Sequence, residues 1–324
     1  MLKIGILNLR KREIGPKIFM RKLSESIQRN GYAKVTNAIF PFFDIAFFNS
    51  IARNFYHKKY ILRLDGLFFD IKNTVGDNDE LNRKIFKSLE KSKGIIFQSK
   101  FSKKLFERFY GEIEKENIII NNGSYLNHVV KEDNLAWNLP NDRIIAITVA
   151  HWRRHKRLQE TVELFEELSL KFKQLFLVVI GPGGNISANK NILHVPSVKN
   201  ADIYKILSHA DFMFHLSWLD NSPNSVVEAL CMKIPVLCSN QGGTKELVEI
   251  SNGGIVSNAD KDFEFELVDL YNPPKPDMNE LYKDAVELIN NLDDYKKKIN
   301  PKPLDIDNVA KRYVEFAERI NQTK

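Results

Sequence analysis

The chain has 324 residues, of which 43% are hydrophobic and 27% charged, and its formal net charge is +7. This length is sufficient for two domains of about 150 residues, each with its own core, and the composition excludes a disordered or low-complexity chain. The two cysteines, Cys231 and Cys238, lack the spacing of a zinc site or a disulfide framework, so we expect them to be reduced core residues.

The sequence that follows Met1 does not have the pattern of a targeting signal. No basic and apolar leader with a cleavage site follows it, and no apolar run approaches the ~18 residues of a membrane span. The sequence therefore predicts a cytoplasmic protein.

Charge is unevenly distributed along the chain. Residues 1–130 carry 24 Lys and Arg against 13 Asp and Glu, a net charge of +11, whereas the remainder carries 24 against 28, a net charge of −4. A basic surface attracts phosphate groups, whether on nucleic acid, on an anionic membrane leaflet or on a phosphorylated lipid carrier. A solvated face that aids solubility is the alternative interpretation.

Short apolar runs alternate with helical stretches along the whole chain, without a repeat of 20 to 50 residues. This alternation predicts an α/β protein with parallel sheets covered by helices. In the first half the pattern predicts strands at 3–8, 33–37, 45–48, 60–64, 94–98 and 118–121, and helices at 17–29 and 102–110.

A second series of elements follows the polar segment 131–142. Its strands are predicted at 144–150, 175–180, 212–216, 235–239 and 254–256. A crossover helix lies between the first two, because apolar residues recur there at spacings of three and four: Leu158, Val162, Phe165, Leu168 and Phe172. The predicted domains are therefore 1–130 and 143–300, and a helix at 306–324, entered after Pro301 and Pro303, completes the first domain.

Residues just after the strands of the second domain are candidates for ligand binding, because ligands of open parallel sheets sit beyond the carboxyl ends of the strands. The strand at 144–150 is followed by a basic run able to hold a diphosphate: His151, Trp152, Arg153, Arg154, His155, Lys156 and Arg157. Later strands are followed by two glycine turns, which begin at Gly181 and Gly242 and let a ligand approach the backbone.

The loop after the strand at 212–216 contains two carboxylates and a predicted helix start. Ser222 is a good N-cap and Pro223 suits the first helical position, so the helix that carries Glu228 is predicted to begin there. Its N-terminal amides can donate hydrogen bonds to a phosphate, and the Glu228 carboxylate can accept hydrogen bonds from both hydroxyls of a ribose. Asp220 stays in the loop, within reach of a sugar hydroxyl.

At these residues the chain resembles, over nearly its whole length, the family 4 glycosyltransferases of the GT-B fold. Their signature is two Glu residues separated by seven others. Asp220 and Glu228 keep that spacing, with Ala229-Leu230, Ile234-Pro235-Val236 and Gly242-Gly243 following as in the family. The resemblance implies two facing Rossmann-like domains with an interdomain cleft, retention of the anomeric configuration, and no protein-bound metal or other cofactor.

The resemblance also implies roles in donor binding. Glu228 binds the ribose, and Asp220, which replaces the first Glu of the motif, contacts the donor sugar. The diphosphate is expected to meet the glycine turn at Gly181 and the backbone at Ser222, Pro223, Asn224 and Ser225. Lys156 keeps a family lysine, whereas His151 occupies the position of a family arginine, and Arg153 or Arg154 supplies the missing cation.

In the first domain, the resemblance places Asp65 where many members have a cleft histidine, and Gly15 in a shortened glycine-rich loop under the transferred sugar. Asp65, Lys156 and Asp220 are the catalytic candidates. Basic residues beside Gly15 are candidates for an anionic acceptor or a membrane leaflet, or form a solvated face: Lys11, Arg12, Lys17, Arg21 and Lys22.

Two other patterns receive a structural interpretation. Asp77-Asn78-Asp79 fits a metal-binding pattern of transferases of another fold, but acidic residues before a helix favour its N-terminus. The phenylalanines at 40–43 are a plausible acceptor or membrane contact, whereas 45–48 read as a buried strand.

These observations predict a retaining glycosyltransferase of the cytoplasm, with a peripheral contact at the inner membrane face, which uses a nucleotide-diphosphate sugar and a glycan, lipid-linked or other acceptor. A non-catalytic sugar-nucleotide-binding protein is one alternative. A nucleic-acid-binding protein is the other, and it is disfavoured because no known module or interleaving of Arg with aromatics is present.

Overall fold

The computed structural model describes residues 1–6, 15–38, 42–52, 59–71, 78–126, 137, 139–186, 188–196, 198 and 200–322. The chain divides into two compact units. The first contains Met1–Ser124, Glu264–Asp269 and Pro303–Lys324, and the second contains Tyr125–Phe263 and Leu270–Lys302. The chain therefore passes between the units four times. The sequence did not predict that the short segment Glu264–Asp269 belongs to the first unit.

The first unit is built on a six-stranded parallel sheet of order β2-β1-β3-β4-β5-β6. Central strands β3 and β4 are buried along almost their whole length, as expected for a parallel sheet covered on both faces. The strands are β1 (Lys3–Ile6), β2 (Lys34–Asn37), β3 (Ile45–Asn49), β4 (Tyr60–Leu64), β5 (Gly94–Phe97) and β6 (Asn117–Ile119). All six lie where the sequence predicted strands; residues 7 and 8 of the first prediction lie outside the described part.

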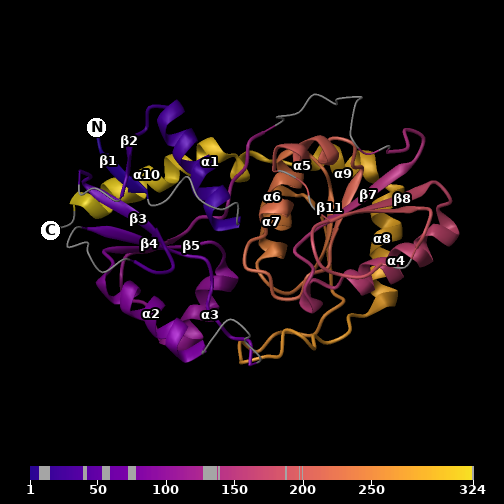
Figure 1. Ribbon diagram of the computed structural model, residues 1–324, viewed down its shortest axis with the longest axis horizontal. Coiled ribbons are helices and arrows are strands. Elements are labelled where there is room, and N and C mark those ends of the chain that lie inside the picture. Colours follow the sequence, from indigo (N-terminus) through magenta and orange to yellow (C-terminus); the bar gives the residue numbers. More distant parts are fainter. Residues whose placement is uncertain are drawn as a thin grey trace. The chain divides into compact units, whose positions relative to one another are not determined.

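Four long helices cover this sheet: α1 (Gly15–Arg29), α2 (Asn78–Lys91), α3 (Lys100–Tyr110) and α10 (Ile306–Gln322). Figure 1 shows α1 and α10 on one side of the sheet and α2 and α3 on the other. The C-terminal helix α10 packs on α1, where the ring of its buried Tyr313 lies 5.9 Å from that of Phe19. α3 begins with a capping box, because the Ser99 hydroxyl accepts from the Ser102 amide and the Ser102 hydroxyl accepts from the Ser99 amide.

The segment Glu264–Asp269 forms a strap on the first unit. The amide of Val268 donates to Phe69 at 3.0 Å, and the carbonyl of Val268 accepts from the amide of Ile71 at 2.9 Å. The ring of Phe265 packs on Phe101 at 5.5 Å. Backbone hydrogen bonds and an aromatic contact thus help to hold the strap on the first unit.

The second unit has a six-stranded parallel sheet of order β12-β11-β10-β7-β8-β9. Its strands are β7 (Ile144–Val149), β8 (Leu175–Ile180), β9 (Ile192–Val195), β10 (Phe212–His215), β11 (Val236–Ser239) and β12 (Gly254–Ser257). Five were predicted and β9 was not. β9 is a four-residue edge strand whose residues are mostly only half-buried, so its apolar signal is weak.

Helices of the second unit are α4 (Leu158–Lys171), α5 (Asn200–Leu207), α6 (Asn224–Cys231), α7 (Thr244–Ser251), α8 (Met278–Asn290) and α9 (Leu292–Lys298). Helix α4 packs on α8, and α6 packs on α7 (Figure 1). Three-residue 3-10 turns occur at Arg154–Lys156 (η1) and Lys302–Leu304 (η2). The order of strands and crossovers is doubly wound, so the carboxyl ends of β7, β10 and β11 share one edge of the sheet.

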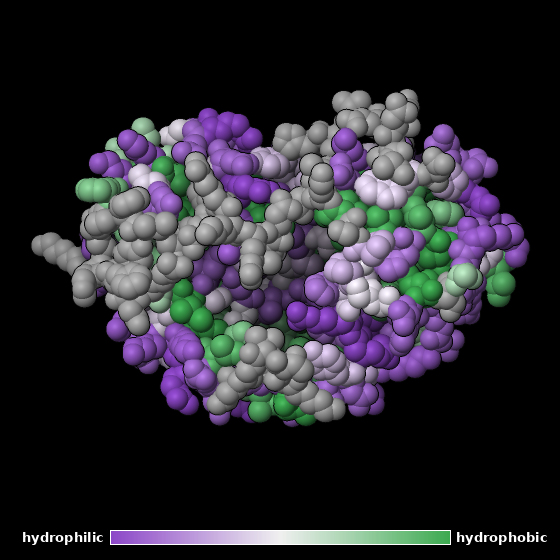
Figure 2. All heavy atoms as spheres, viewed as in Figure 1, coloured by the Kyte–Doolittle hydropathy of each residue, from purple (hydrophilic) through white to green (hydrophobic). Residues whose placement is uncertain are grey.

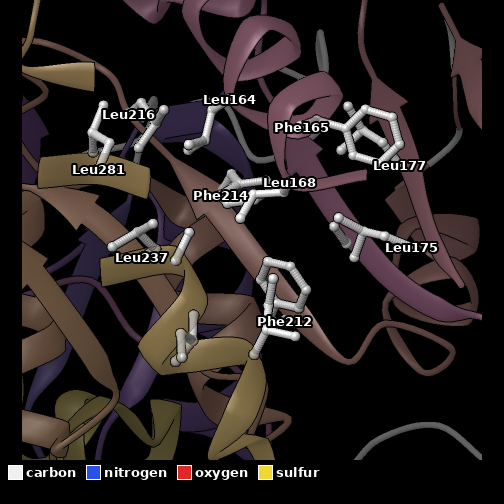
Figure 3. Close-up of a cluster of buried hydrophobic side chains, with 14 of the residues drawn as sticks. Leu164, Phe165, Leu168, Leu175, Leu177, Phe212, Phe214, Leu216, Leu237 and Leu281 are labelled. Atoms are coloured by element: carbon white, nitrogen blue, oxygen red, sulfur yellow. The ribbon is translucent and has the colours of Figure 1, made fainter. Parts of the chain in front are cut away.

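A cluster of buried apolar side chains joins this sheet to α4 and α8 (Figure 3). The labelled residues come from α4, β8, β10, β11 and α8, with Leu216 directly after β10: Leu164, Phe165, Leu168, Leu175, Leu177, Phe212, Phe214, Leu216, Leu237 and Leu281. Each large side chain contributes about 1.5–3 kcal/mol on burial. This core makes a rigid support for the loops at the edge of the sheet.

The surface in Figure 2 intersperses hydrophilic and hydrophobic residues. No helix in the described part of the chain combines the length and the apolar composition needed to cross a membrane.

Candidate functional site

The basic run after β7 separates into residues with different tasks. Arg157, in a left-handed conformation with φ of 55°, is fully buried and pairs with both carboxylate oxygens of Asp260 at 2.6 and 2.7 Å. Arg154 pairs with Glu160 at 2.6 Å. His151 and Arg153 are exposed. Arg157 is therefore a structural cation, and Arg154 is already neutralised by a carboxylate of its own unit.

Lys156 forms an ion pair with Asp220, a residue that lies 64 positions later in the sequence. Both side chains are 18% exposed. Burial alone would raise the pKa of Asp220, but Lys156 and His215 outweigh it and hold the pKa well below its usual range. Asp220 is therefore an ionised carboxylate at the edge of the sheet.

Two histidines border this pair. His215, the last residue of β10, is 4% exposed, and its Nε2 lies 3.6 Å from Asp220 Oδ2. Burial, followed by the charge of Lys156, lowers the pKa of His155 to about 4. Burial also lowers the pKa of His215, and the Asp220 carboxylate offsets only part of that shift. Both imidazoles are neutral beside an ionised Lys156–Asp220 pair.

Glu228 lies inside α6 and is 8% exposed. The Tyr204 hydroxyl donates to Glu228 Oε1 at 3.4 Å, and the Ser225 hydroxyl donates to the carbonyl of Val149 at 3.3 Å. The second contact ties the start of α6 to the end of β7. Lys156 thus follows β7, Asp220 lies in the loop after β10, and Glu228 lies in helix α6, which begins at the end of that loop.

The predicted start of α6 is wrong by one residue. Its N-cap is Pro223, with ψ of 123°, and the first helical residue is Asn224. Pro223 keeps the φ that its ring imposes but takes an extended ψ, and no side chain caps the helix. Ser222 is buried next to the helix rather than capping it.

The glycine turns are required by the approach of neighbouring loops. Gly181 has φ of 117°, and a Cβ atom there would lie 1.8 Å from the carbonyl oxygen of Ala150. At Gly242, with φ of 80°, a Cβ would lie 2.7 Å from the carbonyl oxygen of Asp220, and the Gly243 amide donates to that same oxygen at 2.7 Å. The turn after β11 therefore supports the backbone of Asp220.

The buried polar atoms near Asp220 that have no hydrogen-bond partner within the described residues include Asn221 Oδ1 and Thr244 Oγ1. Thr244 opens α7 directly after the Gly242-Gly243 turn and is 1% exposed. An unpaired buried polar atom costs about 1–3 kcal/mol, so these atoms are suited to receive ligand hydroxyls. Sequence reasoning missed Thr244 and His215, although both directly flank a strand end or glycine turn that it had selected.

In the first unit, Asp65 belongs to a buried polar network rather than standing alone. It pairs with Arg63, which is fully buried, and it accepts from Gln98 Nε2 at 2.9 Å. Arg63 also donates to Asn122 Oδ1 at 2.6 Å and to the Tyr313 hydroxyl at 3.2 Å. The Asp65 side chain keeps 22% exposure. Its carboxylate is largely engaged by these donors.

Other predicted residues of the first unit are placed as follows. Gly15 is the exposed first residue of α1. Lys22 is 7% exposed and donates to Ser124 Oγ at 3.2 Å, which corrects its assignment to an open basic surface. Phe42 is 75% exposed, and Asp79 lies in the first turn of α2. Lys11, Arg12, Phe40 and Asp77 lie outside the described residues.

A metal centre is not formed by the described side chains, because no three His, Cys, Asp or Glu residues among them converge closely enough to hold an ion. Cys231 and Cys238 are both buried and neither is in a disulfide, as the sequence predicted. Among the described residues, the groups available for chemistry at this edge include Lys156, two carboxylates, two neutral histidines, exposed cations after β7, helix amides, and hydroxyl and amide oxygens.

Sequence comparisons connect this half of the chain with known proteins. Residues 130–265 match the family described as Glycosyl transferases group 1. The chain is 31% identical over 109 residues to "Putative teichuronic acid biosynthesis glycosyltransferase TuaC" of Bacillus subtilis (strain 168), which is 34% of this chain and 28% of that protein. It is 24% identical over 188 residues to "Alpha-monoglucosyldiacylglycerol synthase" of Acholeplasma laidlawii, 50% of this chain and 47% of that protein. The matched segments span less than half the length of either relative.

Structural comparisons cover the whole chain. Sucrose-phosphate synthase of Thermosynechococcus elongatus superposes with a TM-score of 0.65 at 13% identity, over 99% of this chain and 96% of that one. Alr3699/HepE of Anabaena, in complex with UDP and glucose, superposes with a TM-score of 0.68 at 13% identity, over 98% and 100%. The two helix-covered, six-stranded parallel sheets therefore have the GT-B fold of glycosyltransferases, and residues 130–265 match the group 1 family of these proteins.

Proposed function

We propose that the chain is a retaining glycosyltransferase of family 4 that transfers a sugar from a nucleotide-diphosphate sugar to a glycan, lipid-linked or other acceptor. One relative with sequence similarity is named for teichuronic acid biosynthesis and the other for the synthesis of a glucosyl diacylglycerol. Cell-surface polysaccharide or glycoconjugate synthesis is therefore the proposed setting, with the protein in the cytoplasm or peripheral to the inner membrane face.

The observation that carries this proposal is the convergence of Lys156, Asp220 and Glu228 at one sheet edge of the matched unit. A nucleotide-diphosphate sugar presents a ribose, two phosphates and a sugar, and this edge offers a partner for each. Glu228 is assigned to the ribose hydroxyls, Lys156 and the start of α6 to the diphosphate, and Asp220 to the donor sugar.

In the proposed reaction no carboxylate of the protein attacks the sugar. Charge develops on the departing nucleotide diphosphate as the glycosidic bond breaks, and Lys156 lies where it can stabilise that charge. His151 and Arg153 are exposed on the same loop and are assigned to the distal phosphate oxygens. Arg154 is a weaker candidate because Glu160 already holds it. The reaction is proposed to need no metal or other cofactor.

Donor turnover tests the proposal. The protein is incubated with UDP-glucose, UDP-N-acetylglucosamine, GDP-mannose and ADP-glucose, with and without short glycans and glycolipids, and the released nucleoside diphosphate is measured. We expect one donor to be turned over faster with an acceptor, and the NMR coupling constant of the product to report the donor's anomeric configuration. An inverted product contradicts retention, and no turnover of any donor contradicts the proposal.

A non-catalytic sugar-nucleotide-binding protein is the second candidate. It is favoured by His151 at a position where the family has arginine, together with the engagement of Arg154 by Glu160. Tight binding of a donor without turnover, across all acceptors tried, identifies this second candidate.

A further inference from the structure

His215 is a buried titratable group for which the proposed function has no role. It is the last residue of β10, and its Nε2 lies 3.6 Å from Asp220 Oδ2. This nitrogen has no hydrogen-bond partner among the described residues. A buried unpaired imidazole nitrogen is costly, so its position beside the key carboxylate calls for an explanation.

Donor binding creates an electrostatic problem at this place. In the structure Lys156 is the counter-ion of Asp220. If Lys156 turns to the diphosphate, as the proposed function requires, the lysine charge is shared with two phosphates and the Asp220 carboxylate loses most of its compensation. A largely buried carboxylate without a counter-ion is disfavoured by several kcal/mol.

The charged and titratable groups that face His215 are few within the described residues. Asp220 favours its protonated form, whereas burial and Lys156 favour the neutral form. His155 directly precedes Lys156 in the chain, and burial, followed by the charge of Lys156, lowers its pKa to about 4. On the neighbouring strand Cys238 pairs in register with His215, and burial raises the pKa of its thiol, so it stays uncharged. Withdrawal of Lys156 removes one of the two influences that keep His215 neutral.

We infer that His215 is a positioning residue that takes up a proton when the donor binds, becoming the counter-ion that holds Asp220 in place after Lys156 turns to the diphosphate. The inference rests on the proposed function. The proton comes from solvent and is bound at Nε2, so that the cluster keeps one cation next to one carboxylate in both states. No bond other than N–H forms in this step.

A sign follows for the pH dependence of donor affinity. Because the bound state holds more protons than the free state, affinity increases as pH falls through the range between the lower pKa of His215 in the free protein and its higher pKa in the complex. With one proton taken up, affinity changes by at most about tenfold per pH unit. The pKa of Asp220 is held well below its usual range, so Asp220 does not titrate in this window, and a diphosphate diester has no proton to exchange at neutral pH.

Calorimetry measures this proton directly. The full-length protein is titrated near pH 6.5 with the tightest-binding of the four donors named above, in buffers of different ionisation enthalpy. The dependence of the observed heat on the buffer gives the number of protons exchanged. We expect uptake of up to one proton by the native protein, and almost none by His215→Asn, which keeps a polar group beside Asp220 but cannot titrate. We also expect His215→Asn to bind as tightly as the native protein at pH 8.5 and several-fold more weakly at pH 6.

His209→Asn is the matched control. Its Nε2 is also buried and without a hydrogen-bond partner in the described part, but it follows α5 at the opposite end of β10. This variant should keep the native proton uptake.

Native binding without proton uptake contradicts the inference while leaving the proposed function intact. Proton uptake that is lost in His155→Gln but kept in His215→Asn assigns the proton to His155. That result also contradicts the inference. Failure of all four donors to bind contradicts the proposed function itself. If His215→Asn does not fold, the side-chain nitrogen shifts of His215 in the native protein, with and without donor, report its protonation instead.

Discussion

Replacing Glu228 by glutamine tests the assignment of the ribose site with the least structural disturbance. The side chain is 8% exposed inside α6, and the Tyr204 hydroxyl reaches one of its oxygens at 3.4 Å, so an isosteric amide fits the same space. The change removes the negative charge that two ribose hydroxyls are proposed to meet. A hydrogen bond to a charged group contributes about 1.5–3 kcal/mol, and loss of the charge weakens both bonds, so we expect a cost of about 2–4 kcal/mol. This corresponds to a dissociation constant raised by roughly 30- to 700-fold.

Isothermal titration with the tightest-binding donor provides the measurement. Glu249→Gln, a change on the exposed face of α7, is the matched control and should leave affinity unchanged. Urea unfolding shows whether each variant is folded. A folded Glu228→Gln protein with native donor affinity would refute the assignment, since a group in contact with the ribose cannot be replaced without effect.

Three further predictions concern the fold, the metal and the membrane. Arg157→Met should lower the free energy of unfolding by about 3–5 kcal/mol in urea titration, because it leaves the buried Asp260 carboxylate without its cation; a loss below 1 kcal/mol contradicts this. Transfer should survive EDTA and Asp77→Asn should be silent; a strict need for added Mn²⁺ that disappears with Asp77→Asn shows that a metal site was overlooked. Reversing Lys17 and Arg21 to Glu should weaken co-sedimentation with anionic vesicles at least ~30-fold at low salt, since each basic residue near such a surface contributes about 1 kcal/mol. Native binding that is indifferent to salt and to both reversals identifies a solvated face.

Much of the fold could be predicted because parallel sheets give a clear pattern. Strand β8 is a continuous apolar run, β4 is apolar except for Arg63, and α4 shows its buried stripe at helical spacing. Edge strand β9 was missed because half-buried residues lack that pattern. The return of the chain to the first unit at Glu264–Asp269 was not predictable, since it depends on contacts of Val268 and Phe265 with residues that lie 164 to 199 positions earlier in the chain.

The candidate site shows the same division. The spacing of Asp220 and Glu228 and the strand ends selected these loops as candidates, but did not indicate which cations are free of a carboxylate partner. In the sequence, Arg154, Lys156 and Arg157 are equivalent candidates for a diphosphate-binding cation. Of the three, Lys156 pairs with Asp220, because Glu160 pairs with Arg154 and Asp260 pairs with Arg157. A local pattern gives the types of side chain in a loop, whereas the partner that neutralises each charge comes from distant segments.

The central claim is that the edge of the second sheet binds a nucleotide sugar, and a thermal-shift titration tests it most directly. A ligand that binds only the folded state stabilises it by about 2.7 kcal/mol at 100 times its dissociation constant. We predict that at least one of UDP-glucose, UDP-N-acetylglucosamine, GDP-mannose and ADP-glucose raises Tm with the logarithm of its concentration, and that Lys156→Ala together with Glu228→Gln abolishes the rise while the variant stays folded. An unchanged Tm at millimolar concentrations of all four donors, or a rise that the double variant retains in full, would contradict the claim.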